Sequence, residues 1–322
     1  MAYTRAVKIV IPGGNGQVGA LLARSFQADG HEVVMLGRSQ ASGQVRGVIW
    51  DAKTLGDWVQ ELENADVVIN LAGRNVNCRY SPENRNEILS SRIDSTRVLG
   101  QAIQSISKPP RVWLQASTAT IYAHRFDQAN SEQSGIIGGH EPDAPKSWAF
   151  SVQVAQSWEA ELERAATPNT RKLALRTSLV MSPDRGGIFD TLLGLVRLGL
   201  GGPAAGGQQF ISWIHEQDFV RAVRFLLKRS DLNGPINLTA PNPEPNAEFM
   251  RHLRQAWGIS LGLPATPWML ELGALVMRSE TELILKSRRV TPQKLLEAGF
   301  AFDFPEWSGA AKELTSRWRS SI

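Results

Sequence analysis

The sequence predicts an α/β fold, in which a doubly wound parallel sheet is followed by a smaller C-terminal α/β substrate lobe. As far as about residue 180, short apolar runs alternate with amphipathic segments, which is the pattern of a parallel sheet with helices on both faces. Beyond that point glycine and proline become dense and the alternation stops. We therefore expect two domains, with residues 1–180 and 215–235 forming the sheet and residues 181–214 and 236–322 forming the lobe.

Runs rich in β-branched residues predict the strands, and segments with helical periodicity predict the helices between them. The first helix begins at Gly16, where apolar side chains recur every four residues. Ser81-Pro82 starts a long second helix, and a third helix precedes Pro168. The predicted strands are Val7–Ile11, Val33–Leu36, Gly47–Trp50, Asp66–Asn70, Val112–Ala116 and Lys172–Thr177.

The composition excludes several classes of protein. Hydrophobic residues make up 42% of the chain and charged residues 20%, as in ordinary globular proteins. The net charge of +4 is too small to indicate a nucleic-acid partner. Cys78 is the single cysteine, so we expect neither a disulfide framework nor a metal site. The sequence has no signal peptide and no long apolar run, so it predicts a cytoplasmic protein without membrane contact. A monomer or a homodimer is expected.

A glycine-rich turn joins the first strand to the first helix. Gly14, Gly16 and Gly19 have the three-glycine spacing of dinucleotide sites, and Gly13 adds further freedom. A backbone without side chains can approach a pyrophosphate closely, and the helix N-terminus supplies N–H donors. In this strand–turn–helix setting the motif predicts a Rossmann-type site, the alternative being a merely tight turn. The predicted contacts are Gly13, Gly14, Asn15, Gly16, Gln17, Val18 and Gly19.

The end of the second strand indicates which dinucleotide is bound. An NAD site favours an acidic residue there, whereas this chain has Arg38 followed by Ser39. A guanidinium can pair with a 2′-phosphate through two charge-assisted hydrogen bonds. The sequence therefore predicts NADP(H) as the preferred cofactor and NAD(H) as the alternative, unless Arg38 is only a solvated surface residue. Asp51, after the third strand, either reaches the adenine amine or caps a loop.

Further cofactor contacts are predicted where the fourth and fifth strands end. Small residues after the fourth strand allow the cofactor to pass closely, and the fifth strand ends beside them in a parallel sheet. The predicted contacts are Leu71, Ala72, Gly73, Ala116 and Ser117.

These motifs together resemble the extended short-chain dehydrogenase/reductase superfamily, in its NAD-dependent epimerase/dehydratase group. GGNGQVG, DVVINLAG, QASTATIY and SWIHEQD occur in the order of that superfamily, up to about residue 230. The chain is also similar to an atypical branch, the epimerase family proteins, with its C-terminal domain of unknown function. The marks of that branch are SRIDSTRVL, RLGLGGPAAGGQQFISWIHEQD, NLTAPNPEPNAEF and SRRVTPQKLLEAGFAF. The resemblance implies an NADP(H)-dependent oxidoreductase or epimerase-type enzyme for a small organic substrate.

The resemblance also implies a catalytic set that this chain matches only in part. A Ser or Thr after the fifth strand polarises the substrate oxygen, and Thr118 matches it. A Tyr-x-x-x-Lys pair is implied on the next helix. There the Tyr position falls on Phe150 or Ser151 and the Lys position on Val154 or Ala155, so the pair is absent.

Tyr122 and then His215 are the candidates for the missing proton donor. The alternatives are a packing tyrosine and a structural histidine. Asp218 is predicted to be the N-cap of the following helix. Arg288 and Arg289 are predicted to lie on a solvated basic face, the alternative being contact with an anionic substrate.

Two functions remain open. The intact dinucleotide motif fits both an enzyme and a silent NADP(H)-binding sensor or carrier. The missing pair favours the silent module, whereas Thr118 and the glycine-rich loop at residues 199–207 favour the enzyme. Five glycines in that loop predict a mobile flap over the nicotinamide end.

Overall fold

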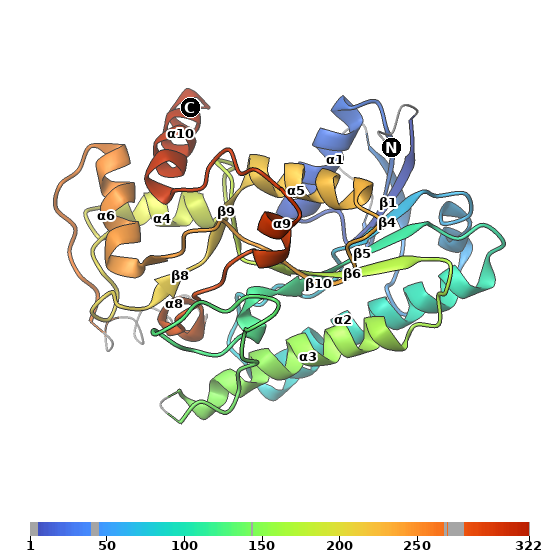
Figure 1. Ribbon diagram of the computed structural model, residues 1–322, viewed down its shortest axis with the longest axis horizontal. Coiled ribbons are helices and arrows are strands. Elements are labelled where there is room, and N and C mark those ends of the chain that lie inside the picture. The colour runs from blue at the N-terminus through green and yellow to red at the C-terminus, as the bar shows by residue number, and fades with distance from the viewer. Residues whose placement is uncertain (1–5, 40–44, 143, 267–268, 270–279, 322) are drawn as a thin grey trace.

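The computed structural model describes residues 6–39, 45–142, 144–266, 269 and 280–321. Within them, seven parallel strands form one sheet in the order β10-β6-β5-β4-β1-β2-β3 (Figure 1). This confirms the predicted fold class and the predicted strands. The strands are β1 (Lys8–Pro12), β2 (Glu32–Gly37), β3 (Arg46–Ile49), β4 (Val67–Asn70), β5 (Val112–Thr118), β6 (Arg171–Thr177) and β10 (Gly234–Leu238).

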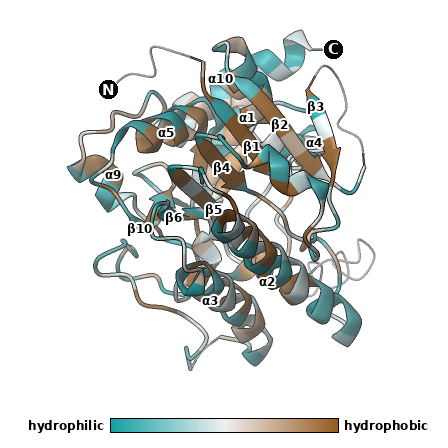
Figure 2. Cartoon of the chain, turned by 90° about the vertical axis from the view of Figure 1, so that its right-hand side faces the viewer, coloured by the Kyte–Doolittle hydropathy of each residue, from teal (hydrophilic) through white to brown (hydrophobic). Residues whose placement is uncertain are grey.

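Two pairs of helices cover the sheet. Helices α1 (Gln17–Ala28) and α5 (Glu216–Lys228) lie on one face, and α2 (Pro82–Ser105) and α3 (Ala149–Arg164) on the other (Figure 2). The strand order reverses between β1 and β4. Ligands of such sheets bind in the crevice at this point, outside the carboxyl ends of the strands.

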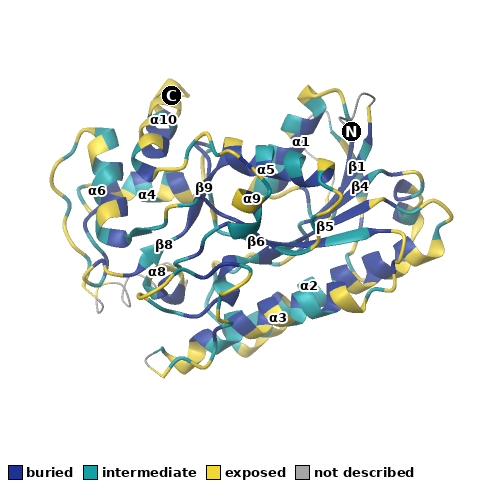
Figure 3. Ribbon diagram, in the orientation of Figure 1, coloured by how far each residue is buried: buried dark blue, intermediate teal, exposed yellow. Residues whose placement is uncertain are grey.

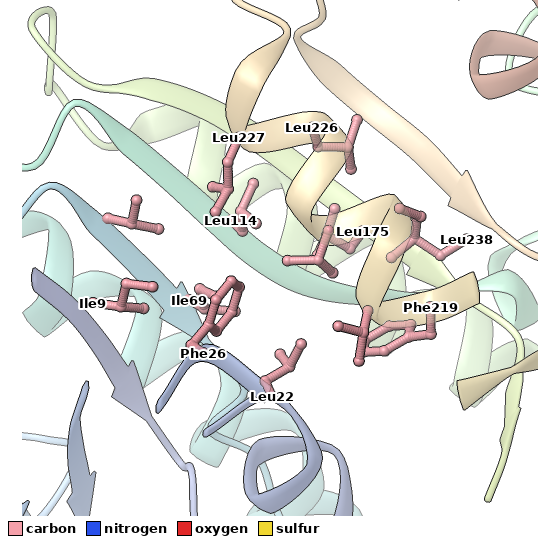
Figure 4. Packing of buried hydrophobic residues seen from close by; sticks show 14 of the residues in the cluster. Ile9, Leu22, Phe26, Ile69, Leu114, Leu175, Phe219, Leu226, Leu227 and Leu238 are labelled. Carbon is pink, nitrogen blue, oxygen red and sulfur yellow. The ribbon is translucent and has the colours of Figure 1, made fainter. Parts of the chain in front are cut away.

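The continuous apolar runs of the strands are explained by burial on both faces. Successive side chains of a strand point to opposite faces, so Ile9 packs with α1 and α5 while Val10 packs with α2. Figure 4 shows the first of these clusters, where Phe26 of α1 and Phe219 of α5 lie over the strands. The central strands are buried and the outer surfaces of the helices are exposed (Figure 3).

A second core lies away from the sheet. It forms between α4 (Ile188–Arg197), α6 (Asn246–Trp257) and α10 (Trp307–Ser320), where the rings of Phe249 and Trp307 stack with centroids 4.1 Å apart. The remaining elements of the described chain are short. They are β7 (Leu179–Met181), β8 (Phe210–Ile211), β9 (Trp213–His215), β11 (Glu244–Pro245), α8 (Glu282–Leu285), α9 (Gln293–Glu297), η1 (Asp57–Glu61), η2 (Ala119–Ile121) and η3 (Lys146–Trp148).

The predicted division into two domains remains a prediction, and two features cross its boundary. Strand β10 extends from Gly234 to Leu238 and pairs with β6, although the boundary was placed after residue 235. Leu295 and Phe300, from the C-terminal part of the chain, are buried in the core between α5 and the sheet. The C-terminal part therefore contributes to both cores.

The glycine-rich loop at residues 199–207 is packed into the lobe. Its backbone pairs with residues 263 and 265 through hydrogen bonds that include Gly202 N–H to the Leu263 oxygen, 3.1 Å. A Cβ on Gly202 would lie 2.5 Å from that oxygen, so glycine permits close approach of two backbones there. The loop is thus packed in this structure, with its glycines at close approaches and left-handed turns, and its mobility over the nicotinamide end remains a prediction.

None of the helices in the described ranges is long and apolar enough to cross a membrane. Across the same ranges, no three side chains of metal-ligand type gather in one place.

Candidate functional site

The glycine-rich turn lies at the carboxyl end of β1, where the strand order reverses. Gly13 has a left-handed backbone with φ +74°, and a Cβ there would lie 2.5 Å from the amide nitrogen of Ala72. A Cβ on Gly19 would lie 2.3 Å from the Gly14 oxygen, so α1 packs directly on the turn. Gly13 thus makes the tight turn and Gly19 allows the close helix contact.

Gly16 is the N-cap of α1 and differs from these two glycines. A Cβ on it would have no described atom nearer than the Gly13 oxygen, at 3.9 Å, so the space in front of it is open. No side chain in the described ranges caps the helix, which leaves its first N–H groups available. Asn15, Gln17 and Val18 surround this N-terminus, and the first two are exposed. An anion fits such a helix end.

Arg38 and Ser39 are exposed beside this turn. The Asn15 amide donates to both the backbone oxygen and the Oγ of Ser39, each at 3.2 Å, which ties the turn to the end of β2. Arg38 has no hydrogen bond or ion pair with any residue in the described ranges. Its guanidinium is therefore available to a ligand.

Asp51 follows β3 and is exposed. Its carboxylate accepts hydrogen bonds from the backbone of Lys53 and from both the backbone and the hydroxyl of Thr54. The Thr54 hydroxyl is the main reason that the pKa of Asp51 lies below its ordinary value. Asp51 caps its own loop in this structure, and contact with an adenine remains a prediction.

The ends of β4 and β5 lie next to the turn. The Leu71 amide donates to the Pro12 oxygen at 2.8 Å, Ala72 is buried against Gly13, and Gly73 is exposed. On β5, Ala116 is half-buried, and the Ser117 hydroxyl donates to Glu159 of α3 at 2.5 Å. The predicted cofactor residues of four strand ends are therefore brought together along one edge of the sheet.

Thr118 ends β5 and is half-buried. Its Oγ1 accepts a hydrogen bond from the Thr120 amide at 3.1 Å, which starts η2. The hydroxyl proton has no partner in the described ranges, so it can be donated to a substrate oxygen.

Tyr122 is 2% exposed, and its hydroxyl is bonded on both sides. It donates to the Asn237 side-chain oxygen at 2.9 Å and accepts from Arg176 at 2.9 Å. Arg176 also forms a two-pronged ion pair with Glu159. Burial raises the pKa of Tyr122 although Arg176 opposes this. These contacts favour the packing alternative for Tyr122.

His215 is fully buried and is the N-cap of α5. Its Nδ1 accepts from the Gln217 amide at 3.1 Å, and its Nε2 lies 2.9 Å from Glu313 of α10. Burial lowers the pKa of His215, so the neutral ring is favoured. The predicted cap, Asp218, is wrong, because its carboxylate instead accepts from the amides of residues 303 and 304. The contacts of His215 favour a structural role.

The helix position of the absent Tyr-x-x-x-Lys pair is filled differently at each residue. Phe150 packs edge-on against the ring of Tyr80, with centroids 5.2 Å apart. Val154 and Ala155 are buried, Ala155 in a cluster with Ala119. The Ser151 hydroxyl donates to Glu282, 131 residues further along the chain, at 2.6 Å.

Sequence reasoning missed the segment around Glu282. Arg288, predicted on a solvated face, is half-buried, and its Nε donates to the Thr120 hydroxyl at 3.0 Å. Lys286 is 2% exposed and donates to the Thr120 backbone oxygen at 2.9 Å. Arg289 donates to backbone oxygens at residues 126 and 127. The concentration of charge in TELILKSRR was the only available signal, and it has the composition of a surface helix.

Comparisons with known proteins agree with this geometry. Residues 9–238 match the model of the NAD dependent epimerase/dehydratase family, and residues 265–314 match a domain of unknown function, DUF1731. The epimerase family protein SDR39U1 of Bos taurus is 30% identical over 96% of this chain and 99% of its own length. The crystal structure of human SDR39U1 (isoform 2) with NADPH has a TM-score of 0.83 at 28% identity, covering 96% of this chain and 99% of that one. A nucleoside-diphosphate sugar epimerase of Corynebacterium glutamicum has a TM-score of 0.75 at 26% identity, covering 97% of this chain and 59% of that one.

Proposed function

The chain belongs to the NAD-dependent epimerase/dehydratase family, and from this membership we propose that it is an NADP(H)-binding enzyme of the oxidoreductase or epimerase type. Its substrate in this proposal is a small organic molecule bound between the ends of the strands and the C-terminal lobe. The observation that carries the proposal is the open, uncapped N-terminus of α1 at Gly16, with a free guanidinium at Arg38 beside it.

The residues around the turn fit a dinucleotide with a 2′-phosphate. The first N–H groups of α1 face the space that a pyrophosphate needs, and Gly16 leaves that space clear. Arg38 can take the 2′-phosphate in a bidentate pair, with Ser39 held next to it by Asn15. The NADPH-bound human relative, which aligns over almost the whole chain, supports the same choice of cofactor.

When bound, a nicotinamide supplies or accepts a hydride. Thr118 would orient the substrate oxygen by donating its hydroxyl proton to it. The Thr120 amide donates to the Thr118 Oγ1, which fixes the position of that oxygen. Thr118 is the last residue of β5, so it lies at the same edge of the parallel sheet as the glycine-rich turn after β1. Donation to an oxygen on which charge develops stabilises the transition state.

The proposal predicts tighter binding of NADPH than of NADH and the loss of this preference in Arg38→Ala. A hydrogen bond to a charged group contributes about 1.5–3 kcal/mol, which is roughly a tenfold or greater change in affinity. Titration calorimetry with both cofactors measures it. Arg251→Ala, which alters a half-buried arginine paired with Glu248 on α6, is the matched control and should leave both affinities unchanged.

Equal affinities of the wild-type protein for the two cofactors would contradict the role of Arg38. Tight NADPH binding without turnover of any carbonyl or nucleotide-sugar substrate would favour the silent sensor or carrier instead.

A further inference from the structure

The segment at residues 280–290 connects the C-terminal part of the chain to the predicted active-site edge. It lies beside the N-terminal half of α3 and the loops that follow β5 (Figure 1). Glu280 accepts from the Tyr80 amide just before α2, at 2.6 Å, and Glu282 accepts from Ser151 of α3. Lys286 and Arg288 both bond to Thr120, two residues after Thr118.

Ser151 is on the face of α3 that meets the end of β5. Ala155 packs against Ala119, the residue after Thr118, and Ser151 precedes Ala155 by one helical turn. Residues four apart share one face of a helix, about 5–6 Å apart. Ser151 is half-buried, and its hydroxyl donates to Glu282.

Glu282 differs from the other buried carboxylates of the described chain. Glu61, Glu161 and Glu216 are each ion-paired with an arginine, and Asp218 accepts hydrogen bonds from two backbone N–H groups. Glu282 is 3% exposed, accepts from a side-chain hydroxyl on one oxygen, and has no hydrogen bond in the described ranges on the other oxygen, Oε1. A buried polar atom without a partner is costly, so it indicates another role.

The surroundings of Glu282 suit a carboxyl that gains and loses a proton. Burial raises its pKa, while Arg288, Ser151 and Lys286 act to lower it. The Lys286 ammonium lies 3.9 Å from Oε1, and its own pKa is lowered to about 8 by burial. The remaining charged and titratable groups that face this cluster are Tyr80, Glu280 and Glu141.

We propose that Ser151 exchanges a proton with the bound substrate and that Glu282 is the positioning residue behind it, which supplies and receives that proton. The inference rests on the proposed NADP(H)-dependent function, and it assigns the acid–base role that the absent Tyr-x-x-x-Lys pair leaves vacant. In this proposal the carboxyl group that assists Ser151 of α3 belongs to Glu282, in the C-terminal part of the chain.

In carbonyl reduction, the substrate carbon accepts a hydride from a reduced nicotinamide, and the C–O π pair moves to oxygen. In this direction Glu282 is protonated and donates to the Ser151 Oγ, so the Ser151 hydroxyl turns from Glu282 to the substrate oxygen. The Ser151 O–H bond then breaks as its proton passes to that oxygen, and the Glu282 carboxyl proton passes to the Ser151 Oγ. Glu282 is left as a carboxylate facing Lys286 and regains a proton from solvent. In alcohol oxidation each transfer runs in reverse.

The first test needs no cofactor. An infrared pH titration of wild-type protein minus Glu282→Gln isolates the carboxyl signal of Glu282. We expect Glu282 to stay protonated well above the ordinary glutamate pKa of about 4.3, and its signal to shift in Ser151→Ala. If Glu282 ionises at the ordinary glutamate pKa, or if its carboxyl signal is unchanged in Ser151→Ala, the pairing of Ser151 with Glu282 is overturned. Because this result does not depend on NADPH, it is separate from failure of the proposed function.

The second test is the pH profile of NADPH oxidation with an electron-poor aromatic aldehyde as the probe. A positioned acid contributes about 10²–10⁴-fold, so Ser151→Ala and Glu282→Gln should each lower kcat by roughly 100-fold without raising KM. Each should also remove the fall in rate at high pH. The double variant should be no slower than either single variant, and Glu282→Asp should recover part of the rate.

The control is Glu244→Gln, another glutamate whose pKa burial raises, and whose charged neighbours are His252, Glu306 and Glu248. It should leave the profile unchanged. Multiplicative losses in the double variant, an unchanged pH profile, or wild-type protein that binds NADPH and never reduces the aldehyde would each overturn the relay.

Discussion

Tyr122 shows how hydrogen-bond partners decide a residue's role at the end of β5. Its phenol donates to Asn237 and accepts from Arg176, so both of its hydrogen-bonding directions are used within the protein. A hydroxyl that already donates and accepts within the protein must break a buried hydrogen bond before it can donate to a substrate. Ser151 hydrogen-bonds to Glu282 and to the Tyr80 phenol, but it is half-buried where Tyr122 is fully buried.

Tyr122→Phe should therefore destabilise the protein without weakening cofactor binding. Removing the hydroxyl leaves Arg176 and Asn237 each short of a buried partner, which costs about 1–3 kcal/mol. Urea denaturation measures the free energy of unfolding, and calorimetry with NADPH measures the affinity. A variant with wild-type stability and reduced turnover would instead support Tyr122 as the proton donor.

His215 should make stability depend on pH. Burial lowers its pKa in the folded chain, so between that value and the unfolded value of about 6.5 the unfolded chain binds more protons. The free energy of unfolding therefore falls as the pH drops below about 6.5. His215→Asn keeps a side chain able to cap α5 and cannot titrate. Urea denaturation at pH 5 and pH 8 should show a smaller pH difference for the variant, and an equal difference would contradict this.

Asp218 and His215 show a limit of sequence reading at single residues. An aspartate before an apolar helical run predicts an N-cap, and the segment WIHEQDF offers one. Yet α5 begins at Glu216 with His215 as its cap, while Asp218 bonds to the backbone at residues 303 and 304. Those contacts lie more than 80 residues away, and no local pattern contains them.

At the scale of elements, the glycines of the glycine-rich turn have two different roles, since Gly19 permits close packing and Gly16 leaves space for a ligand. A Cβ on Gly19 would lie 2.3 Å from neighbouring backbone, whereas a Cβ on Gly16 would face open space. The same substitution should therefore act differently at the two positions. This contrast could not be derived from the spacing of the glycines, because both positions belong to one motif.

Gly19→Ala should destabilise the fold by about 1–3 kcal/mol or more, because α1 must move away from the turn. Gly16→Ala should keep nearly wild-type stability and lose most NADPH affinity, because the methyl group enters the space proposed for the pyrophosphate. Thermal unfolding without cofactor and calorimetry with NADPH separate the two effects. The reverse outcome, with Gly16→Ala unstable and Gly19→Ala unable to bind, would refute the assignment.

The sequence predicted strands and helices well where the pattern was local. β-branched runs identified β1 to β6, but β10 reads GPINL, and its glycine, proline and asparagine hide an edge strand. The close packing of the loop at residues 199–207 could not be predicted, because glycine permits both conformational freedom and close approach of backbones. The pairing of Ser151 with Glu282 joins α3 to α8, and periodicity carries no information about such a contact.

At the scale of the whole molecule, the C-terminal part links the two cores. Leu295 and Phe300 are buried against α5 and the sheet, whereas Trp307 and Trp318 are buried with α4 and α6. Neither core is complete without this part of the chain. The two predicted domains are therefore expected to unfold together.

A chain that ends at Thr266 should fail to form a stable fold. It lacks Leu295, Phe300, Trp307 and Trp318, and burying each such side chain contributes about 1.5–3 kcal/mol against a total stability of about 5–15 kcal/mol. Far-UV circular dichroism during urea titration should show no cooperative transition. A chain that ends at Ser320 is the control and should unfold like the full protein. A cooperative transition in the shorter chain would mean that the sheet domain folds alone.

The sequence separation of Ser151 and Glu282 also has a consequence for protein synthesis. Glu282 is added 131 residues after Ser151, which at about 5–20 residues per second is a delay on the order of ten seconds. The glycine-rich turn and strands β1 to β6 all precede residue 178. During synthesis the residues of the proposed nucleotide site are therefore present before those of the proposed acid–base pair. If the proposed pair is the acid–base group, a nascent chain is inactive until the C-terminal segment has emerged and the fold that depends on it is complete.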